Sequence, residues 1–403
     1  MTHYYQICLE NSVINVIKVF NDKKVPIIIF NEEIYKDLTY IDDIGIFQVL
    51  NSFKKKLRSS KNFKFATFAP FFDQKQSVFQ NYFEESGHHV EVISKLDPWS
   101  IQNLEAVSLF IIIKEEYRIE ITVLRERLSQ YWWFYTDDNL VDVPSYDTYI
   151  RIMNKVKLRK LQFDGFHVMS PINISENFNE NVFIPCNYTR SLEFYNKYPQ
   201  DTSQKAQDFK SNALKVLHKA KEILDYLKIP FWLSSGTCLG YYRQCDVITY
   251  SKDVDIGIFT SDYRPSIIPD FVSGGFALIH VFGKENDSYE LSFELHGIKL
   301  DIFFFYEEDQ YTWNGGLQAK TGKRFKYIFS KFNLCWTEFL NLKVRIPCQT
   351  SQYIEDNYGK NWFIPVKEWD WKSSPPNVRQ NGIWPRNMWS EVIQVNRYEC
   401  IIY

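Results

Sequence analysis

Short apolar runs alternate with mixed apolar and polar stretches along the first half of the chain. Four of these runs have the length of a buried strand, and they lie at residues 25–30, 63–68, 90–93 and 107–113. Strands separated by amphipathic segments are typical of layered folds in which helices pack on a sheet. The first half therefore predicts a layered α/β domain.

A repeat of apolar residues at spacings of three and four indicates one long helix after residue 203. Its members are Ala206, Phe209, Ala213, Leu217, Ala220, Leu224 and Leu227. This spacing places an apolar stripe on one helix face, Asp201-Thr202-Ser203 offers N-cap side chains, and Pro230 ends the helix. Because the preceding residues 131–199 are aromatic, polar and rich in turn signals, we place a domain boundary after residue 200.

The second half contains further runs that predict strands. They lie at residues 231–233, 254–259, 277–282, 289–295 and 298–305. The final segment, residues 353–403, is rich in Trp and Pro, and we expect it to wrap over this second domain. We therefore predict two domains: a layered α/β domain at residues 1–200 and a second domain of helices and strands (α+β) at residues 201–403.

Composition narrows the classes of function. The 403 residues allow two hydrophobic cores, and 47 Lys and Arg nearly balance 49 Asp and Glu, so no positive field attracts nucleic acid. No run of eighteen apolar residues occurs, and we expect no membrane anchor in this sequence. Seven scattered cysteines indicate neither a zinc ribbon nor a dense disulfide framework, and we expect Cys238 and Cys245 to be buried thiols.

Two carboxylates project from one face of a predicted strand. The period of two along Lys252-Asp253-Val254-Asp255-Ile256 puts Asp253 and Asp255 on one side and apolar residues on the other. Their Cα atoms would lie about 7 Å apart, which suits a divalent cation that bridges to phosphate oxygens. A solvated edge strand shows the same pattern, so this pair alone does not decide between the two interpretations.

Two further signals favour the metal site. Gly236-Thr237 ends a predicted strand at a helix start, where backbone N–H groups can face a phosphate. Asp301 lies within an apolar strand, where an unpaired charge would be costly. A glycine turn, an acid-x-acid strand and a later single acid follow one another in this order in the nucleotidyltransferase fold, so we predict a catalytic domain of this fold at residues 201–403. We therefore predict Asp253, Asp255 and Asp301 as catalytic metal ligands, with Asp301 assisting proton removal.

Charged residues around this core are candidates for donor binding. Arg243 follows the glycine turn, and Lys320 and Lys323 belong to a basic cluster that could bind donor phosphates. A solvated basic loop is the alternative interpretation of that cluster. Asp370 lies between two tryptophans that could stack on a base, although such aromatics are more often core residues. Together with Gly236 and Thr237, these residues form the predicted donor site.

Longer stretches resemble the fukutin family and the related LicD-type phosphocholine transferases. The motifs lie at residues 232–245, 250–259, 299–308 and 369–385, whereas the first half is similar mainly at residues 159–163. The resemblance implies Mg²⁺ or Mn²⁺ at the three aspartates and a CDP-linked donor. For the fukutin family it implies CDP-ribitol, with ribitol 5-phosphate passed to the phosphorylated O-mannosyl glycan of alpha-dystroglycan.

The resemblance also implies a compartment and partners. Members of the fukutin family act in the Golgi, beside other glycan transferases, and carry a signal anchor that does not stand at the start of this sequence. Some relatives have another acid where this chain has Ser251-Lys252, so one or two metals are expected. Three alternatives stay open: a non-catalytic glycan-binding or scaffold protein, a transferase that uses CDP-glycerol or CDP-choline, and an enzyme that adds a nucleotide to its acceptor.

Overall fold

The computed structural model describes residues 2–31, 34, 43–99, 104–115, 117–136, 149–155, 157–163, 165–172 and 182–396. The chain forms two compact units, Met1–Phe183 and Ile184–Tyr403. The boundary predicted after residue 200 differs from this division, because residues 184–200 belong to the second unit. Their helix is α5 (Tyr188–Lys197). The disulfide Cys186–Cys245 joins the segment just before α5 to the C-cap residue of α7 (Ser235–Gln244).

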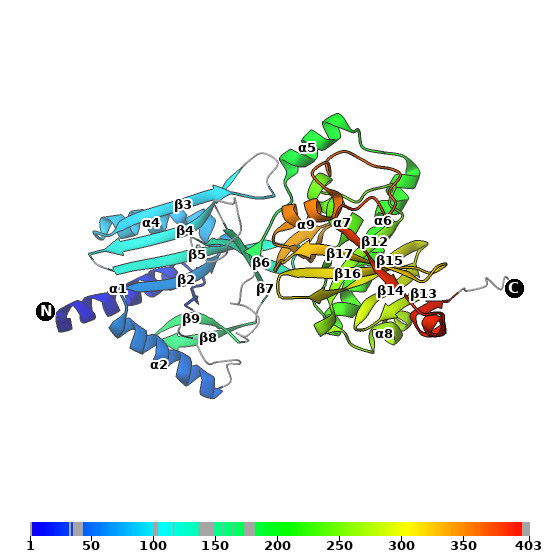
Figure 1. The fold of residues 1–403 in the computed structure, drawn as a ribbon. Helices are drawn as coiled ribbons and strands as arrows, with labels where there is room; N and C mark the ends of the chain where they lie inside the picture. The colour runs from blue at the N-terminus through cyan, green and yellow to red at the C-terminus, as the bar shows by residue number, and fades with distance from the viewer. Residues whose placement is uncertain are drawn as a thin grey trace. The chain divides into compact units, whose positions relative to one another are not determined.

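The first unit contains a mixed sheet and several helices (Figure 1). Its helices are α1 (Thr2–Asp22), α2 (Asp43–Ser59), α3 (Ala69–Phe72), η2 (Asp73–Lys75) and α4 (Gln76–Glu85). Its strands are β1 (Ile28–Ile29), β2 (Asn62–Phe68), β3 (His89–Leu96), β4 (Glu105–Lys114), β5 (Tyr117–Arg127), β6 (Tyr131–Thr136), β7 (Tyr149–Asn154), β8 (Leu158–Phe163), β9 (Phe166–Pro171) and β10 (Val182–Phe183). The four predicted strands correspond to β1 to β4, so the expected mixture of helices and strands is present.

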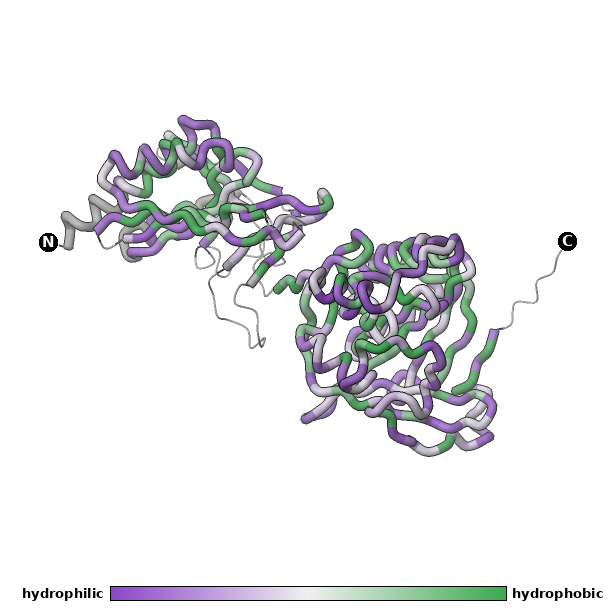
Figure 2. Tube along the Cα trace, turned by 90° about the horizontal axis from the view of Figure 1, so that it is seen from above, coloured by the Kyte–Doolittle hydropathy of each residue, from purple (hydrophilic) through white to green (hydrophobic). Residues whose placement is uncertain are grey.

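Pairing in this sheet is mostly antiparallel. Its order is β3-β4-β5-β2-β1-β9-β8. The last residues of β5 pair with β6, β6 pairs with β7, and β7 pairs with β10. Parallel pairs join β2 to β5 and β1 to β9. Alternation along β2 sends Phe63 and Phe65 into a core with α1, α2 and α4, while Ala66 belongs to a smaller cluster on the other face. Figure 2 shows hydrophobic (green) and hydrophilic (purple) segments following one another along the chain.

The second unit is built around a sheet of nine strands within residues 184–396. Its strands are β11 (Trp232–Leu233), β12 (Asp253–Phe259), β13 (Ala277–Lys284), β14 (Asp287–Leu295), β15 (Ile298–Glu307), β16 (Tyr311–Gln318), β17 (Lys323–Ser330), β20 (Val378–Ile383) and β21 (Ile393–Val395). Strands β18 (Leu334–Phe339) and β19 (Leu342–Pro347) form a hairpin outside this sheet. The remaining helices are α6 (Gln204–Tyr226), η3 (Thr260–Asp262), α8 (Ile267–Ser273), α9 (Thr350–Tyr358), η4 (Arg386–Met388) and α10 (Trp389–Val392).

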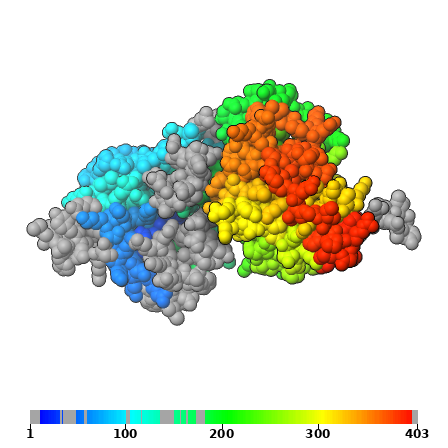
Figure 3. Space-filling model, viewed as in Figure 1, coloured from blue at the N-terminus to red at the C-terminus, as the bar shows by residue number. Residues whose placement is uncertain are grey.

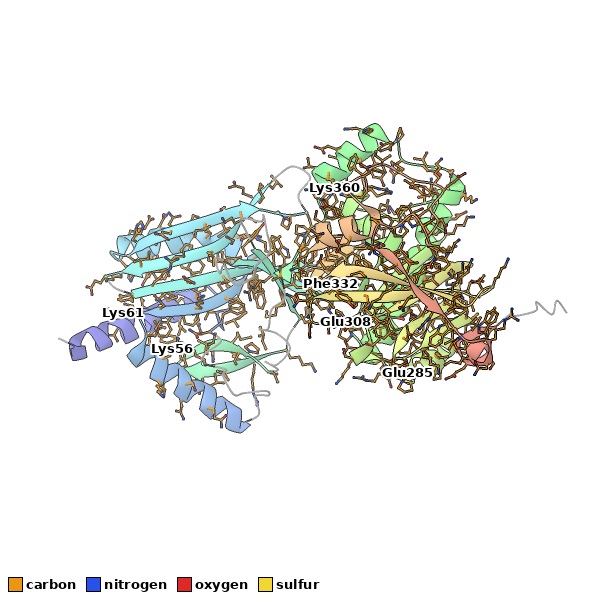
Figure 4. All side chains as sticks on the ribbon, viewed as in Figure 1. Lys56, Lys61, Glu285, Glu308, Phe332 and Lys360 are labelled. Carbon is orange, nitrogen blue, oxygen red and sulfur yellow. A yellow bond between two sulfur atoms is a disulfide. The ribbon has the colours of Figure 1, made fainter. Side chains whose placement is uncertain are left out.

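Strand β15 is the centre of this sheet. It pairs in parallel with β12 and antiparallel with β14, while its last residues pair with β16. The apolar face of β12 packs on the predicted long helix α6, whose buried stripe and Ser203 N-cap are as expected. At one end of the core, Trp232 packs against Phe259 and Phe305, and also against Phe332, which is labelled in Figure 4.

The segment after residue 353 adds strands at both edges of the sheet. Strand β20 pairs with β17, and β21 pairs with β13. Figure 3 shows this orange and red part on the surface of the second unit, beside the yellow strands. The predicted wrapping is therefore present up to residue 396, and residues 397–403 lie outside the described part.

Cysteine pairing differs from the expectation. Cys245 is bonded to Cys186, and Cys335 is bonded to Cys348, whereas Cys238 is a buried free thiol whose pKa is raised by burial. The expectation of a thiol at Cys245 was wrong because its partner is 59 residues away in the sequence. None of the helices among the described residues combines the length and the apolar character needed to cross a bilayer.

Candidate active site

A cavity of about 370 Å³ lies over one face of the sheet in the second unit. Its walls come from β12 to β17, from the start of α7, from the end of α9 and from the segment after α9. Its ionisable residues include Asp253, Asp255, His280, Glu290, Lys299 and Asp301. Four carboxylates thus share the cavity with one lysine, which gives it a negative charge.

The parallel pairing of β12 with β15 brings the three predicted aspartates together. Asp255 and Asp301 are direct register partners, and Asp253 lies two residues before Asp255 on the same face of the sheet. One oxygen of each carboxylate lies within 4.8 Å of the other two. This distance allows the three side chains to share one cation after small adjustments.

The start of α7 is joined to this group by two hydrogen bonds. The backbone N–H of Gly236 donates to Oδ2 of Asp255 at 3.0 Å, and the N–H of Asp255 donates to Oγ1 of Thr237 at 2.8 Å. A methyl group at Gly236 would lie 3.3 Å from Oδ2 of Asp255 and 4.0 Å from the hydroxyl of Tyr358. The glycine therefore allows the helix start to approach the carboxylate closely.

The charge of this group is only partly neutralised by protein side chains. Lys299 donates to Oδ2 of Asp301 at 2.7 Å, and Ser292 donates to the other oxygen. Burial raises the pKa of Asp301 to about 6, against the effect of Lys299. Burial also raises the pKa of Asp255, and the neighbouring charges of Asp253 and Asp301 add to this rise. A divalent cation fits this set of hard oxygen ligands and would compensate its charge.

The sequence analysis did not identify His280 and Glu290, which belong to the same cavity. His280 on β13 is opposite Ser292 on β14, which is opposite Asp301 on β15. Nε2 of His280 lies 3.3 Å from Oε1 of Glu290. His280, Glu290 and Asp301 also form a second group whose ligand atoms lie within 4.8 Å of one another. Only the pairing of three strands creates this group, so no local sequence signal reveals it.

Aromatic residues form another part of the cavity wall. Trp369 packs on Tyr358 with ring centroids 4.9 Å apart. The hydroxyl of Tyr327 donates to the backbone oxygen of Trp371 at 2.9 Å. Both tryptophans come from the segment after α9, so this segment contributes to the cavity as well as to the sheet edges.

The predicted donor-binding residues are not all at the cavity. Gly236 lines it, and Thr237 lies directly behind Asp255. Lys320 and Lys323 are exposed at the turn between β16 and β17, and neither is among the lining residues. Asp370 accepts hydrogen bonds within its own turn, including one from Ser373 at 2.8 Å. The roles of these residues stay predictions.

Arg243 is buried inside the unit. Its guanidinium donates to Oε1 of Gln244 at 2.8 Å and stacks over Phe194 at 4.6 Å. Burial lowers its pKa. These contacts indicate that Arg243 holds α5 and α7 together, and its predicted contact with donor phosphate stays a prediction.

Two family models match the chain. One is described as "LicD/FKTN/FKRP, nucleotidyltransferase domain" and matches residues 228–349, which include the three aspartates. The other is described as "Fukutin N-terminal" and matches residues 60–214. The second model crosses from the first unit into the second.

Curated relatives agree with these matches. "Ribitol-5-phosphate transferase FKTN" of Macaca fascicularis is 48% identical over 292 residues, which cover 69% of this chain and 63% of that protein. The Homo sapiens protein of the same name is 47% identical over the same length, with the same coverage. The chain thus spans less than two thirds of the length of either relative. An uncharacterized protein of Caenorhabditis elegans is 27% identical over 263 residues, which cover 58% of this chain and 68% of that protein. On the family models and these identities together, the chain belongs to the fukutin family.

Proposed function

We propose that this chain is a metal-dependent transferase that moves ribitol 5-phosphate from CDP-ribitol to a glycan. In this proposal the second unit has the nucleotidyltransferase fold and contains the active site. The observation that carries the proposal is the meeting of Asp253, Asp255 and Asp301 beside the start of α7 in one cavity. The name of the relatives supplies the transferred group.

Asp253, Asp255 and Asp301 are the proposed ligands of Mg²⁺ or Mn²⁺. A bound divalent cation supplies positive charge to the diphosphate of the donor, which a negatively charged cavity would otherwise repel. The raised pKa values of Asp255 and Asp301, the close approach of the three carboxylates and the hard oxygen donor set support this assignment. Gly236 and Thr237 hold the helix start against Asp255, and the N-terminus of a helix favours a bound phosphate.

The proposed reaction is a displacement at phosphorus. A hydroxyl oxygen of the acceptor attacks the phosphorus that carries ribitol, and the bond from that phosphorus to the oxygen shared with CMP breaks. CMP leaves with this oxygen, and the hydroxyl proton passes to a base. Asp301 is the proposed base, because burial raises its pKa to about 6 and it is still ionised at neutral pH. Lys299 donates a hydrogen bond to Asp301 and partly neutralises the charge of this carboxylate.

We propose a Golgi location and the phosphorylated O-mannosyl glycan of alpha-dystroglycan as the acceptor. The disulfides Cys186–Cys245 and Cys335–Cys348 support an oxidising compartment of the secretory pathway. The first unit is the proposed site of acceptor recognition or of assembly with other glycan transferases. CDP-ribitol rather than another CDP-alcohol is proposed from the relatives' name.

Release of CMP tests this proposal. Purified protein, CDP-ribitol, Mn²⁺ and a phosphorylated O-mannosyl glycopeptide are mixed, and CMP is measured by chromatography. We expect acceptor-dependent release by the wild type and none by Asp253→Asn, with CDP-glycerol and CDP-choline as poorer donors. Equal release by Asp253→Asn would refute the metal assignment. If none of the three donors releases CMP although Mn²⁺ is bound, a non-catalytic role would be favoured.

A further inference from the structure

Asn314 is a buried amide in the cavity wall whose oxygen lacks a partner. It lies on β16, lines the cavity and is 5% exposed. Within the described part of the chain, its Oδ1 is one of six buried side-chain atoms without a hydrogen-bond partner. Of these six, only Asn314 Oδ1 belongs to a residue that lines the cavity. Because buried polar atoms are nearly always paired, this oxygen indicates a place for a ligand group.

The position of Asn314 relative to the aspartates fits one extended ligand. Asn314 is the register partner of Phe305, which follows Asp301 by four residues on β15. Strand geometry therefore separates the Cα atoms of Asp301 and Asn314 by roughly 14 Å. A nucleotide whose phosphate lies at the aspartates would reach Asn314 with its base, since the ribose lies nearer to the phosphate.

Two aromatic rings of the cavity wall lie near Asn314, against the same strand. Gly316 is on the same face of β16, and a methyl group there would lie 3.1 Å from the ring of Tyr327 and 3.2 Å from that of Trp371. The glycine thus allows the rings of Tyr327 and Trp371 to lie close against β16. Tyr327 and Trp371 also line the cavity, and aromatic walls of this kind stack on nucleobases.

We propose that Asn314 binds the exocyclic amino group of the cytosine in the donor. This inference rests on the proposed function, which provides a CDP-linked donor. The amino group donates to Oδ1, and the amide N–H of Asn314 can donate to the adjacent ring nitrogen. Phosphate groups carry no hydrogen to donate and cannot satisfy Oδ1. Asn314 is then a residue that determines the specificity for the base.

A pair of ligands that differ only in the amino group tests this contact. CMP and the 5′-monophosphate of 2-pyrimidinone riboside, which lacks that group, are titrated calorimetrically into the full chain with Mn²⁺. We expect the wild type to bind CMP about tenfold more tightly, the usual effect of one buried hydrogen bond. In Asn314→Leu the two ligands should bind equally. Asn314→Ala should behave in the same way, because its smaller side chain cannot block the ligand sterically.

Asn377→Leu is a matched control. Asn377 is also buried and its Oδ1 also lacks a partner among the described residues, but it does not line the cavity. The tenfold preference should persist in this variant. A preference that also persists in Asn314→Leu and Asn314→Ala, or a wild type without preference, would overturn the inference while the proposed function stands. Wild-type protein that binds Mn²⁺ but neither nucleotide would overturn both.

Discussion

The backbone N–H of Gly236 donates a hydrogen bond of 3.0 Å to Oδ2 of Asp255. The start of α7 is thereby fixed against a carboxylate of β12, although 18 residues separate the two in sequence. Asp255 in turn is the register partner of Asp301 on β15. Two strands and a helix start therefore depend on one another at the proposed metal site.

Gly236→Ala tests how closely the helix start must approach Asp255. The added methyl group would lie 3.3 Å from Oδ2 of Asp255 and 3.5 Å from Oγ of Ser251. Contacts this tight should displace the carboxylate slightly without unfolding the unit. We expect Mn²⁺ affinity to fall about tenfold, equal to about 1.4 kcal/mol, with thermal unfolding shifted by only a few degrees. Calorimetric titration with Mn²⁺ measures the effect, and unchanged affinity would show that the close approach is not required.

Asp255→Asn should separate metal binding from stability. The variant removes a buried charge that Asp253 and Asp301 repel, so we expect loss of Mn²⁺ binding together with a higher melting temperature in the absence of metal. Glu294→Gln is the control, because Glu294 is an exposed residue of β14 outside the cavity. It should change neither property. Wild-type Mn²⁺ affinity in Asp255→Asn would remove this carboxylate from the site.

The affinity for metal should depend on pH because protons compete for the same oxygens. Burial raises the pKa of Asp301 to about 6, so Mn²⁺ binding should weaken steadily as the pH falls through 6. Titrations between pH 5 and 8 measure this dependence. An affinity that is constant over this range would contradict the raised pKa.

The same shift gives a stability prediction for the metal-free protein. A folded-state pKa of about 6, above the ordinary value of 3.8, means that the folded state binds more protons between these pH values. The free energy of unfolding should therefore decrease as the pH rises from about 4 to 6, with Asp301 contributing roughly 3 kcal/mol of that loss. Urea unfolding with a chelator present measures it. Comparison with Asp301→Asn isolates the contribution, and an identical pH dependence in this variant would contradict it.

The disulfide Cys186–Cys245 should stabilise the second unit. It closes a loop across 59 residues and links the segment just before α5 to the end of α7, so its removal should cost about 2–4 kcal/mol of unfolding free energy. Cys186→Ala, Cys245→Ala and the double variant should lose equal amounts, because each breaks the same bond. Urea unfolding compares the three. Additive losses would instead indicate two independent packing contributions.

The elements with local signals could be predicted from the sequence. The stripe of α6, its Ser203 cap and the strands that carry Asp253, Asp255 and Asp301 all follow from short-range patterns. The grouping of the three aspartates also followed from their order along the chain. The residue of β15 that lies opposite Asp255 could not be predicted, because the register of two strands is decided by contacts between distant segments.

Long-range contacts account for the features that the sequence analysis missed. His280 and Glu290 meet because β13 pairs with β14, and neither has a distinctive neighbour in sequence. Residues 184–200 belong to the second unit because the Cys186–Cys245 bond and α5 attach them to α7. That Oδ1 of Asn314 lacks a hydrogen-bond partner is visible only in the three-dimensional structure, because it depends on the positions of the surrounding atoms.

The mass of the acceptor after reaction tests the central claim most directly. A phosphorylated O-mannosyl glycopeptide is incubated with CDP-ribitol, Mn²⁺ and either the wild type or Asp255→Asn, and the peptide is analysed by mass spectrometry. We predict that the peptide gains one ribitol phosphate with the wild type and stays unchanged with Asp255→Asn. A gain of a cytidine nucleotide instead, or the same ribitol phosphate gain with Asp255→Asn, would contradict the account.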